Sequence, residues 1–188
     1  MVATACLKNQ ANKPIRLMFQ DEARFGRMSN PRSCWAPAPQ RPMVNLALIR
    51  EFRYEYAAVS PWDGALDYLT AEKMNTDNMS LFLDQVGKSH GQDFIVMILD
   101  GASSHKCKDL KVPENITLVF LPPYSPELNP AEQIWNILRR NYFANKVFDS
   151  LNAATIQAET GLQNMSCDRK GLQSLTNWPW INAILKDS

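Results

Sequence analysis

The segment LPPYSPELNPAEQIW, from Leu121 to Trp135, places four prolines ahead of a predicted amphipathic helix. Asn129 is a good helix N-cap, Pro130 suits the first helical position, and Glu132 falls at the third. This is the spacing of a capping box, in which the glutamate reaches back to the N–H of the cap. Glu132 also has a second interpretation, as one member of a catalytic cluster. The rest of the chain decides between the two.

The composition describes one domain of ordinary size. The chain has 188 residues and is 45% hydrophobic, which is enough for a single domain with a real core. Its net charge of +1 gives no indication of a nucleic-acid partner, so such a site would have to be a local patch. The four cysteines are scattered without a C-x-x-C pair, which argues against metal-binding thiolates. We find no membrane span or signal peptide and expect a soluble, cytoplasmic protein without a membrane partner.

Two predicted strands lead into aspartates. In residues 15–25 (IRLMFQDEARF), apolar residues alternate onto one face, and Asp21 follows them at the expected carboxyl end of the strand. Residues 94–99 are apolar without a break, as in a central strand buried on both faces, and Asp100 follows directly. Ligands bind beyond the carboxyl ends of parallel strands, so we expect Asp21 and Asp100 to end neighbouring strands at one site.

The other predicted elements complete an α/β order. Two or three antiparallel strands are expected in residues 44–61 and 65–69, a helix from Thr76 to about Gly87 or Gly91, and another buried strand at residues 116–121. Helices are expected after Asn129 and in the segment LNAATIQAETGLQNM. The order β-β-β-α-β-α-β-α-α predicts a mixed sheet flanked by helices.

A third carboxylate joins the two aspartates in this arrangement. The strand ending at Leu121 leads into the helix of Glu132, which places that side chain beside the same edge of the sheet. Carboxylates at such a short separation repel each other unless a cation neutralises them. A small set of hard oxygen ligands suits Mg²⁺ or Mn²⁺, which keep bound water and accept phosphate oxygens.

Three segments, FQDEARFG, ILDGASSHK and LPPYSPELNPAEQIW, resemble the catalytic motifs of the mariner-like DDE transposases, in particular their bacterial insertion-sequence branch. The third segment is the most specific, and the resemblance extends from about Ile15 to the WPWI tail. It implies a ribonuclease H-like fold with a mixed five-stranded sheet. Asp21, Asp100 and Glu132 match the metal-binding catalytic triad, which favours the catalytic interpretation of Glu132. The spacing between the last two is slightly short for the family and suggests a trimmed loop.

The resemblance also implies an activity and partners. The implied reaction is cleavage of DNA at transposon ends and strand transfer into target DNA, with two Mg²⁺ ions per site, for which Mn²⁺ can substitute. The implied partner is double-stranded DNA, on the nucleoid, with a dimer in the active complex. Residues 1–188 are expected to form a single catalytic domain, with its core at about 15–165 and without the upstream helix-turn-helix domain that such transposases carry.

Residues around the triad are candidates for supporting it or for contacting DNA. Asn129 is expected to orient the turn of Glu132, and Glu22 to face away from Asp21 in a solvated role. His105 matches a histidine often present in the family and is expected either to contact phosphate or water, or to serve only at the start of a helix. The candidates for DNA contacts are Arg24, Arg27, Arg32, His105, Lys106, Arg139 and Arg140, with further charges at Lys108, Lys111 and Lys146; for each charge the alternative is a solvated surface.

Two other functions remain open. The chain is alternatively a catalytically silent transposase remnant that acts as a DNA-binding or assembly module, although no triad residue is altered. It is alternatively another ribonuclease H-like nuclease, acting on RNA–DNA hybrids or junctions. The segment SPELNPAE argues against this last possibility.

Overall fold

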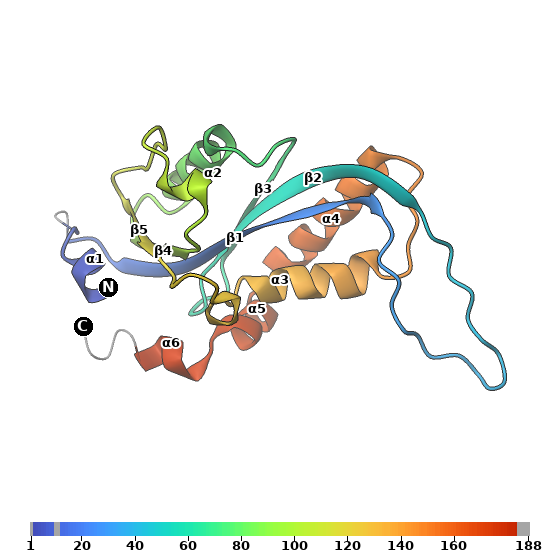
Figure 1. The fold of residues 1–188 in the computed structure, drawn as a ribbon. Helices are drawn as coiled ribbons and strands as arrows, with labels where there is room; N and C mark the ends of the chain where they lie inside the picture. Colours follow the sequence, from blue (N-terminus) through green and yellow to red (C-terminus); the bar gives the residue numbers. More distant parts are fainter. Residues whose placement is uncertain (1, 10–11, 184–188) are drawn as a thin grey trace.

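A mixed five-stranded sheet lies at the centre of the computed structural model, which describes residues 2–9 and 12–183 (Figure 1). Its strands are β1 (Ile15–Met28), β2 (Leu48–Val59), β3 (Leu66–Ala71), β4 (Phe94–Leu99) and β5 (Ile116–Phe120). Their order in the sheet is β3-β2-β1-β4-β5. The β1–β4 and β4–β5 pairs are parallel, and the β1–β2 and β2–β3 pairs are antiparallel. The predicted mixed five-stranded sheet is confirmed.

Helices cover both faces of this sheet. They are α1 (Val2–Cys6), α2 (Thr76–Ser89), α3 (Glu132–Ile137), α4 (Leu151–Cys167), α5 (Arg169–Thr176) and α6 (Pro179–Ala183), with the 3-10 helices η1 (Ser103–Lys106) and η2 (Pro126–Leu128) and the π-helix η3 (Leu138–Phe143). Helix α2 lies on one face, and α3, α4 and α5 lie on the other (Figure 1). None of the helices in the described part of the chain is long and apolar enough to cross a bilayer.

One predicted helix is wrong. The element expected between β4 and β5 is reduced to the single 3-10 turn η1. The connecting sequence GASSHKCKDLKVPEN has no apolar stripe at helical spacing, so a longer helix there would have no face to bury.

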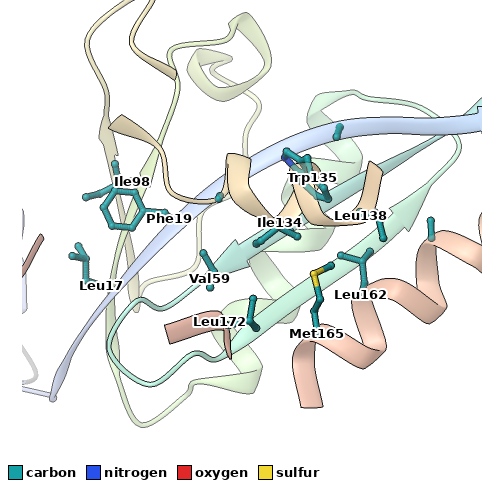
Figure 2. Close-up of a cluster of buried hydrophobic side chains, with 14 of the residues drawn as sticks. Leu17, Phe19, Val59, Ile98, Ile134, Trp135, Leu138, Leu162, Met165 and Leu172 are labelled. Carbon is teal, nitrogen blue, oxygen red and sulfur yellow. The ribbon is translucent and has the colours of Figure 1, made fainter. Parts of the chain in front are cut away.

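Each face of the sheet has its own core. On the α2 face, Met79, Phe82, Leu83 and Val86 follow the spacing i, i+3, i+4, i+7 and pack in a cluster with residues such as Met97. Figure 2 shows the other core, with side chains from β1, β2, β4, α3, η3, α4 and α5: Leu17, Phe19, Val59, Ile98, Ile134, Trp135, Leu138, Leu162, Met165 and Leu172. Burying a side chain of this kind stabilises the fold by about 1.5–3 kcal/mol, so this core fixes α3 against β1.

Strand β1 is longer than its sequence pattern predicts. Asp21 was expected at its carboxyl end, but the strand continues to Met28 because β2 pairs with it along that whole length. The parallel pairing with β4 stops earlier, at Phe19 opposite Ile98. Asp21 therefore lies in mid-strand, just beyond the part that β4 covers. Continuing the register brings it level with Asp100.

The connection between β1 and β2, residues 29–47, extends away from the body of the domain (Figure 1). Near its base, Asn30 forms an isolated parallel bridge with Ala144, just after η3. The Ser29 hydroxyl accepts a hydrogen bond from the Ala47 N–H at 2.9 Å, which closes the two ends of the connection.

Candidate active site

Three carboxylates from separate elements line one cavity of about 460 Å³. Asp21 comes from β1, Asp100 follows the last residue of β4, and Glu132 is the first residue of α3. The structure thus brings together the three residues that the motifs single out. The rest of the lining is Gly101, Ala102, Lys106, Leu121, Pro122, Pro123, Tyr124, Ser125, Pro126 and Asn129.

Asp21 lies in surroundings that disfavour its charged form. Its burial raises its pKa to about 7, and the negative charge of Glu132 adds to this. The indole Nε1 of Trp135 donates a hydrogen bond to Asp21 Oδ2 at 2.9 Å and opposes the shift. The repulsion that raises the pKa of Asp21 comes from Glu132 and, to a smaller extent, from Glu22.

Asn129 holds the turn that carries Glu132. Its buried side chain accepts a hydrogen bond from the Ala131 N–H at 3.1 Å and donates one to the Gln20 carbonyl at 2.9 Å. The N–H of Asn129 itself donates to the Pro126 carbonyl at 2.9 Å. The Asn129 N–H, which the Glu132 carboxylate would accept in a capping box, is therefore already bonded to Pro126. The same bonds join the start of α3 to β1.

Asp100 has a different environment, because its side chain is 57% exposed in the loop after β4. Its Oδ1 accepts a hydrogen bond from the Ala102 N–H at 2.9 Å and lies 2.9 Å from His105 Nδ1. On the other side of the ring, His105 Nε2 lies 2.7 Å from Glu22 Oε1. The side chains of His105 and Glu22 are only 1% and 7% exposed.

These contacts correct two expectations. Glu22 does face away from Asp21, but the solvated role predicted for it is wrong, because η1 covers its carboxylate with His105. The buried ring of His105 leaves no surface for a phosphate group, so the expected DNA contact does not fit its position. Burial lowers the pKa of His105, but the hydrogen bond to Glu22 and the charge of Glu22 outweigh burial and raise it.

The basic residues expected to contact DNA are spread over several elements, among them β1, η1 and η3. Lys106 lines the carboxylate cavity, with its Nζ 5.4 Å from the centre of the Phe120 ring. Arg27 pairs with Glu51 at 3.1 Å and is less available to a ligand. Arg24 and Arg139 lie over aromatic rings, Arg140 bonds its neighbour Asn141, and Arg32, Lys108, Lys111 and Lys146 lie on the exposed surface.

Sequence patterns missed the second role of Trp135. It belongs to the apolar stripe of α3, and the structure buries it to 1% exposure, but its N–H also holds Asp21. It follows Glu132 by three residues, a spacing that places both on one side of a helix. Tyr124 was also missed; it lines the cavity, is fully exposed and has a φ of 58°, which is rare for a residue with a side chain.

The donor set fits a hard divalent cation. Within the described residues, no three His, Cys, Asp or Glu side chains converge closely enough to form a finished metal site. The carboxylates instead surround a shared cavity, and the repulsion between Asp21 and Glu132 is the kind that a bound cation relieves. Carboxylate oxygens beside an open cavity suit Mg²⁺ or Mn²⁺, since these ions keep several water ligands.

The chain is similar to a known family and to a curated relative. The family model described as DDE superfamily endonuclease matches residues 16–154. The uncharacterized protein y4pE/y4sA of Sinorhizobium fredii (strain NBRC 101917 / NGR234) is 43% identical over 96 residues, which cover 50% of this chain and 71% of that protein.

Solved structures of the Mos1 mariner transposase share the fold. The paired-end complex with the left transposon end has a TM-score of 0.56 at 12% identity, over 94% of this chain and 60% of that one. The paired-end complex with Mg has a TM-score of 0.58 at 14% identity, over 86% of this chain and 52% of that one. The chain therefore spans 60% or less of these two transposase chains. The shared architecture is ribonuclease H-like. Because the family model covers most of the chain, the protein belongs to the DDE superfamily endonucleases.

Proposed function

We propose that this chain is the catalytic domain of a transposase, which cleaves DNA at transposon ends and transfers the freed strand into target DNA. The observation that carries the proposal is that carboxylates from β1, from the loop after β4 and from the start of α3 line one cavity in a DDE endonuclease domain. Asp21, Asp100 and Glu132 are the proposed catalytic and metal-binding residues. Residues 1–188 are proposed to form one domain with its core at about 15–165.

The three carboxylates would hold two Mg²⁺ ions, for which Mn²⁺ can substitute. Bound there, such ions would activate the attacking water or DNA 3′-hydroxyl and stabilise the departing 3′-oxygen. The chain's own residues prepare the site for them. Trp135 fixes one oxygen of Asp21, and Asn129 joins the start of α3 to β1. Lys106 places a positive charge beside the cavity, where it would attract a DNA phosphate.

The proposed partner is double-stranded DNA, at the transposon ends and at the target. The Mos1 transposase has been solved in a paired-end complex with a transposon end and in a strand transfer complex, which supports this partner. A dimer is proposed for the active complex. With a net charge of +1, the domain must bind DNA through local contacts, for which Arg24, Arg139 and Arg140 lie on the surface around β1 and η3.

A nicking assay on supercoiled plasmid tests the proposal. The unmodified chain should nick DNA with Mg²⁺ or Mn²⁺ and not with EDTA, and Asp21→Asn, Asp100→Asn and Glu132→Gln should each abolish nicking. Glu127→Gln is the matched control, because Glu127 is exposed in η2 and is not part of the cavity lining. DNA binding without metal-dependent cleavage would favour the silent remnant instead. Cleavage of RNA–DNA hybrids but not of duplex DNA would favour another ribonuclease H-like nuclease.

A further inference from the structure

A buried pair of side chains lies behind the candidate site. Glu22 follows Asp21 in β1 and therefore faces the opposite side of the sheet, where Tyr56 is its partner on β2. There it meets His105 of η1, with 2.7 Å between Oε1 and Nε2. The Nδ1 atom of the same ring lies 2.9 Å from Asp100 Oδ1 and 3.2 Å from the Asp100 carbonyl oxygen. Both ring nitrogens of His105 thus face oxygen atoms.

We infer that Glu22 and His105 are positioning residues, which fix the Asp100 carboxylate in the orientation that binds a divalent cation. This inference rests on the proposed function of Asp100. Of the two aspartates, Asp100 is the one that needs such support, because it follows the end of β4 in a loop and its side chain is 57% exposed. A carboxylate in that setting has freedom of rotation that must be lost when it binds a cation.

The support reaches Asp100 from a rigid element. Glu22 belongs to the part of β1 that pairs continuously with β2, and its carboxylate is 7% exposed. The His105 ring is held at both nitrogens and is itself 1% exposed, so it does not turn toward solvent. Glu22, fixed in the sheet, therefore holds the His105 ring, and that ring in turn holds the Asp100 carboxylate in its loop. Partners behind metal ligands act in this way, and removing one commonly weakens metal binding about 10–100-fold.

The chain contains a matched pair that lacks this connection. Its other histidine, His90, lies at the end of α2 with Nε2 2.7 Å from Asp67 Oδ2. These side chains are 15% and 13% exposed, and neither residue lines the carboxylate cavity. If such a pair only stabilises the fold, substitution of either histidine should lower stability. Loss of metal binding should follow substitution of His105 only.

Calorimetric titration of the full chain with Mn²⁺ tests the inference. We expect Glu22→Gln and His105→Gln each to weaken Mn²⁺ binding about 10–100-fold, and His90→Gln to leave it unchanged. Because both residues act through the contact of His105 with Asp100, the double variant should lose little more Mn²⁺ affinity than His105→Gln alone. Thermal melts without metal identify variants that fail to fold. If His105→Gln does not fold, Glu22→Gln carries the test.

The two histidines also allow a spectroscopic measurement. In the His90→Gln variant, His105 is the remaining histidine of the chain, so its ring ¹⁵N resonances are assigned at once. Saturation with Mg²⁺ should shift these resonances, although the buried ring does not touch the ion. In the Asp100→Asn variant of the same protein the shift should disappear. A purely structural role for His105 predicts resonances that do not respond to Mg²⁺.

The possible failures are distinguishable. If the unmodified chain binds no Mn²⁺, the proposed function and the positioning role are both overturned. If it binds Mn²⁺ and Asp100→Asn abolishes that binding, while the Glu22 and His105 variants bind as the unmodified chain does, only the positioning role is overturned. Unshifted His105 resonances at Mg²⁺ saturation would overturn it as well.

Discussion

The indole nitrogen of Trp135 donates to the carboxylate of Asp21 at 2.9 Å, and this bond joins helix α3 to strand β1 at the candidate active site. The ring is 1% exposed and packs beside Phe25 at a centroid distance of 5.9 Å. One side chain thus serves both the core and the site. The position of Glu132, three residues earlier on the same helix, consequently depends on the packing that buries Trp135.

Trp135→Phe should separate these two roles. The substitution keeps an aromatic ring in the core but removes the N–H that Asp21 accepts. A hydrogen bond to a charged group contributes about 1.5–3 kcal/mol, so we expect a loss of that order in the free energy of unfolding at pH 8, together with weaker Mn²⁺ binding. Urea denaturation and a Mn²⁺ titration measure the two effects.

The control for this change is Trp178→Phe. The Trp178 Nε1 donates to the Leu175 carbonyl at 3.1 Å, away from the carboxylate cavity. A neutral hydrogen bond of this kind contributes about 0.5–1.5 kcal/mol. Trp178→Phe should therefore lower stability modestly and leave Mn²⁺ binding intact. Unchanged Mn²⁺ affinity in Trp135→Phe would show that its bond to Asp21 is not needed at the site.

Asp100 and Glu132 should respond differently to neutralisation. Asp100→Asn should leave the metal-free fold intact and abolish stabilisation by Mn²⁺, because a ligand stabilises only a protein that binds it. Glu132→Gln should also abolish that stabilisation. Without metal, however, it should raise the melting temperature at pH 8, since it removes the charge that repels Asp21. Thermal melts with and without Mn²⁺ compare the variants, and an equal metal-induced shift in Asp100→Asn and the unmodified chain would exclude Asp100 as a ligand.

A buried glutamate away from the cavity should make stability depend on pH. Glu55 of β2 is fully buried, and burial raises its pKa from 4.5 to about 7; the hydrogen bond from Thr70, at 2.7 Å, opposes this and the charge of Glu159 adds to it. Between pH 4.5 and 7 the folded protein therefore binds more protons at Glu55 than the unfolded chain does. Its contribution to stability is complete below pH 4.5 and is lost as the pH rises through 7.

Glu55→Gln should remove that dependence. The amide keeps the shape of the side chain and has no charge to bury, so the variant should be more stable than the unmodified chain at pH 8. The shift in pKa corresponds to a gain on the order of 3 kcal/mol. Denaturation at pH 4.5, 6 and 8 should show a flatter profile for Glu55→Gln, whereas Glu114→Gln, at an exposed position, should retain the original slope. Identical slopes in all three proteins would mean that Glu55 ionises normally.

The sequence predicts those features of the fold that depend on local pattern. The unbroken apolar run at residues 94–99 is the buried interior strand β4, and the helical stripe that begins at Met79 packs on the sheet as α2. The end of β1 was not predictable in this way. The segment around Asp21 remains a strand because β2 continues beside it, and that depends on a partner far along the chain.

The same distinction explains what sequence patterns missed around the site. Alternation along β1 correctly predicts that Glu22 faces away from Asp21. Its burial, however, comes from His105, which lies 83 positions later, and the donor to Asp21 comes from Trp135, 114 positions later. Motifs identify the carboxylates because each is recognisable in its own segment. The side chains that hold them come from other segments and have no local pattern of their own.

Binding of DNA by this chain alone should be weak and independent of sequence. With a net charge of +1, its affinity must come from phosphate contacts by exposed residues such as Arg24 and Arg140. Such contacts carry no sequence information and release counterions, so binding should weaken steeply with salt. We expect dissociation constants of about 10⁻⁴–10⁻⁶ M at physiological salt, similar for a transposon-end duplex and a scrambled one.

Arg140→Gln should lower the slope of log affinity against log salt by about 1, and Arg27→Gln by less, because Arg27 already pairs with Glu51. Titrations at several salt concentrations measure these slopes; tight, salt-insensitive preference for the end duplex would show that this chain carries a sequence-recognition element of its own.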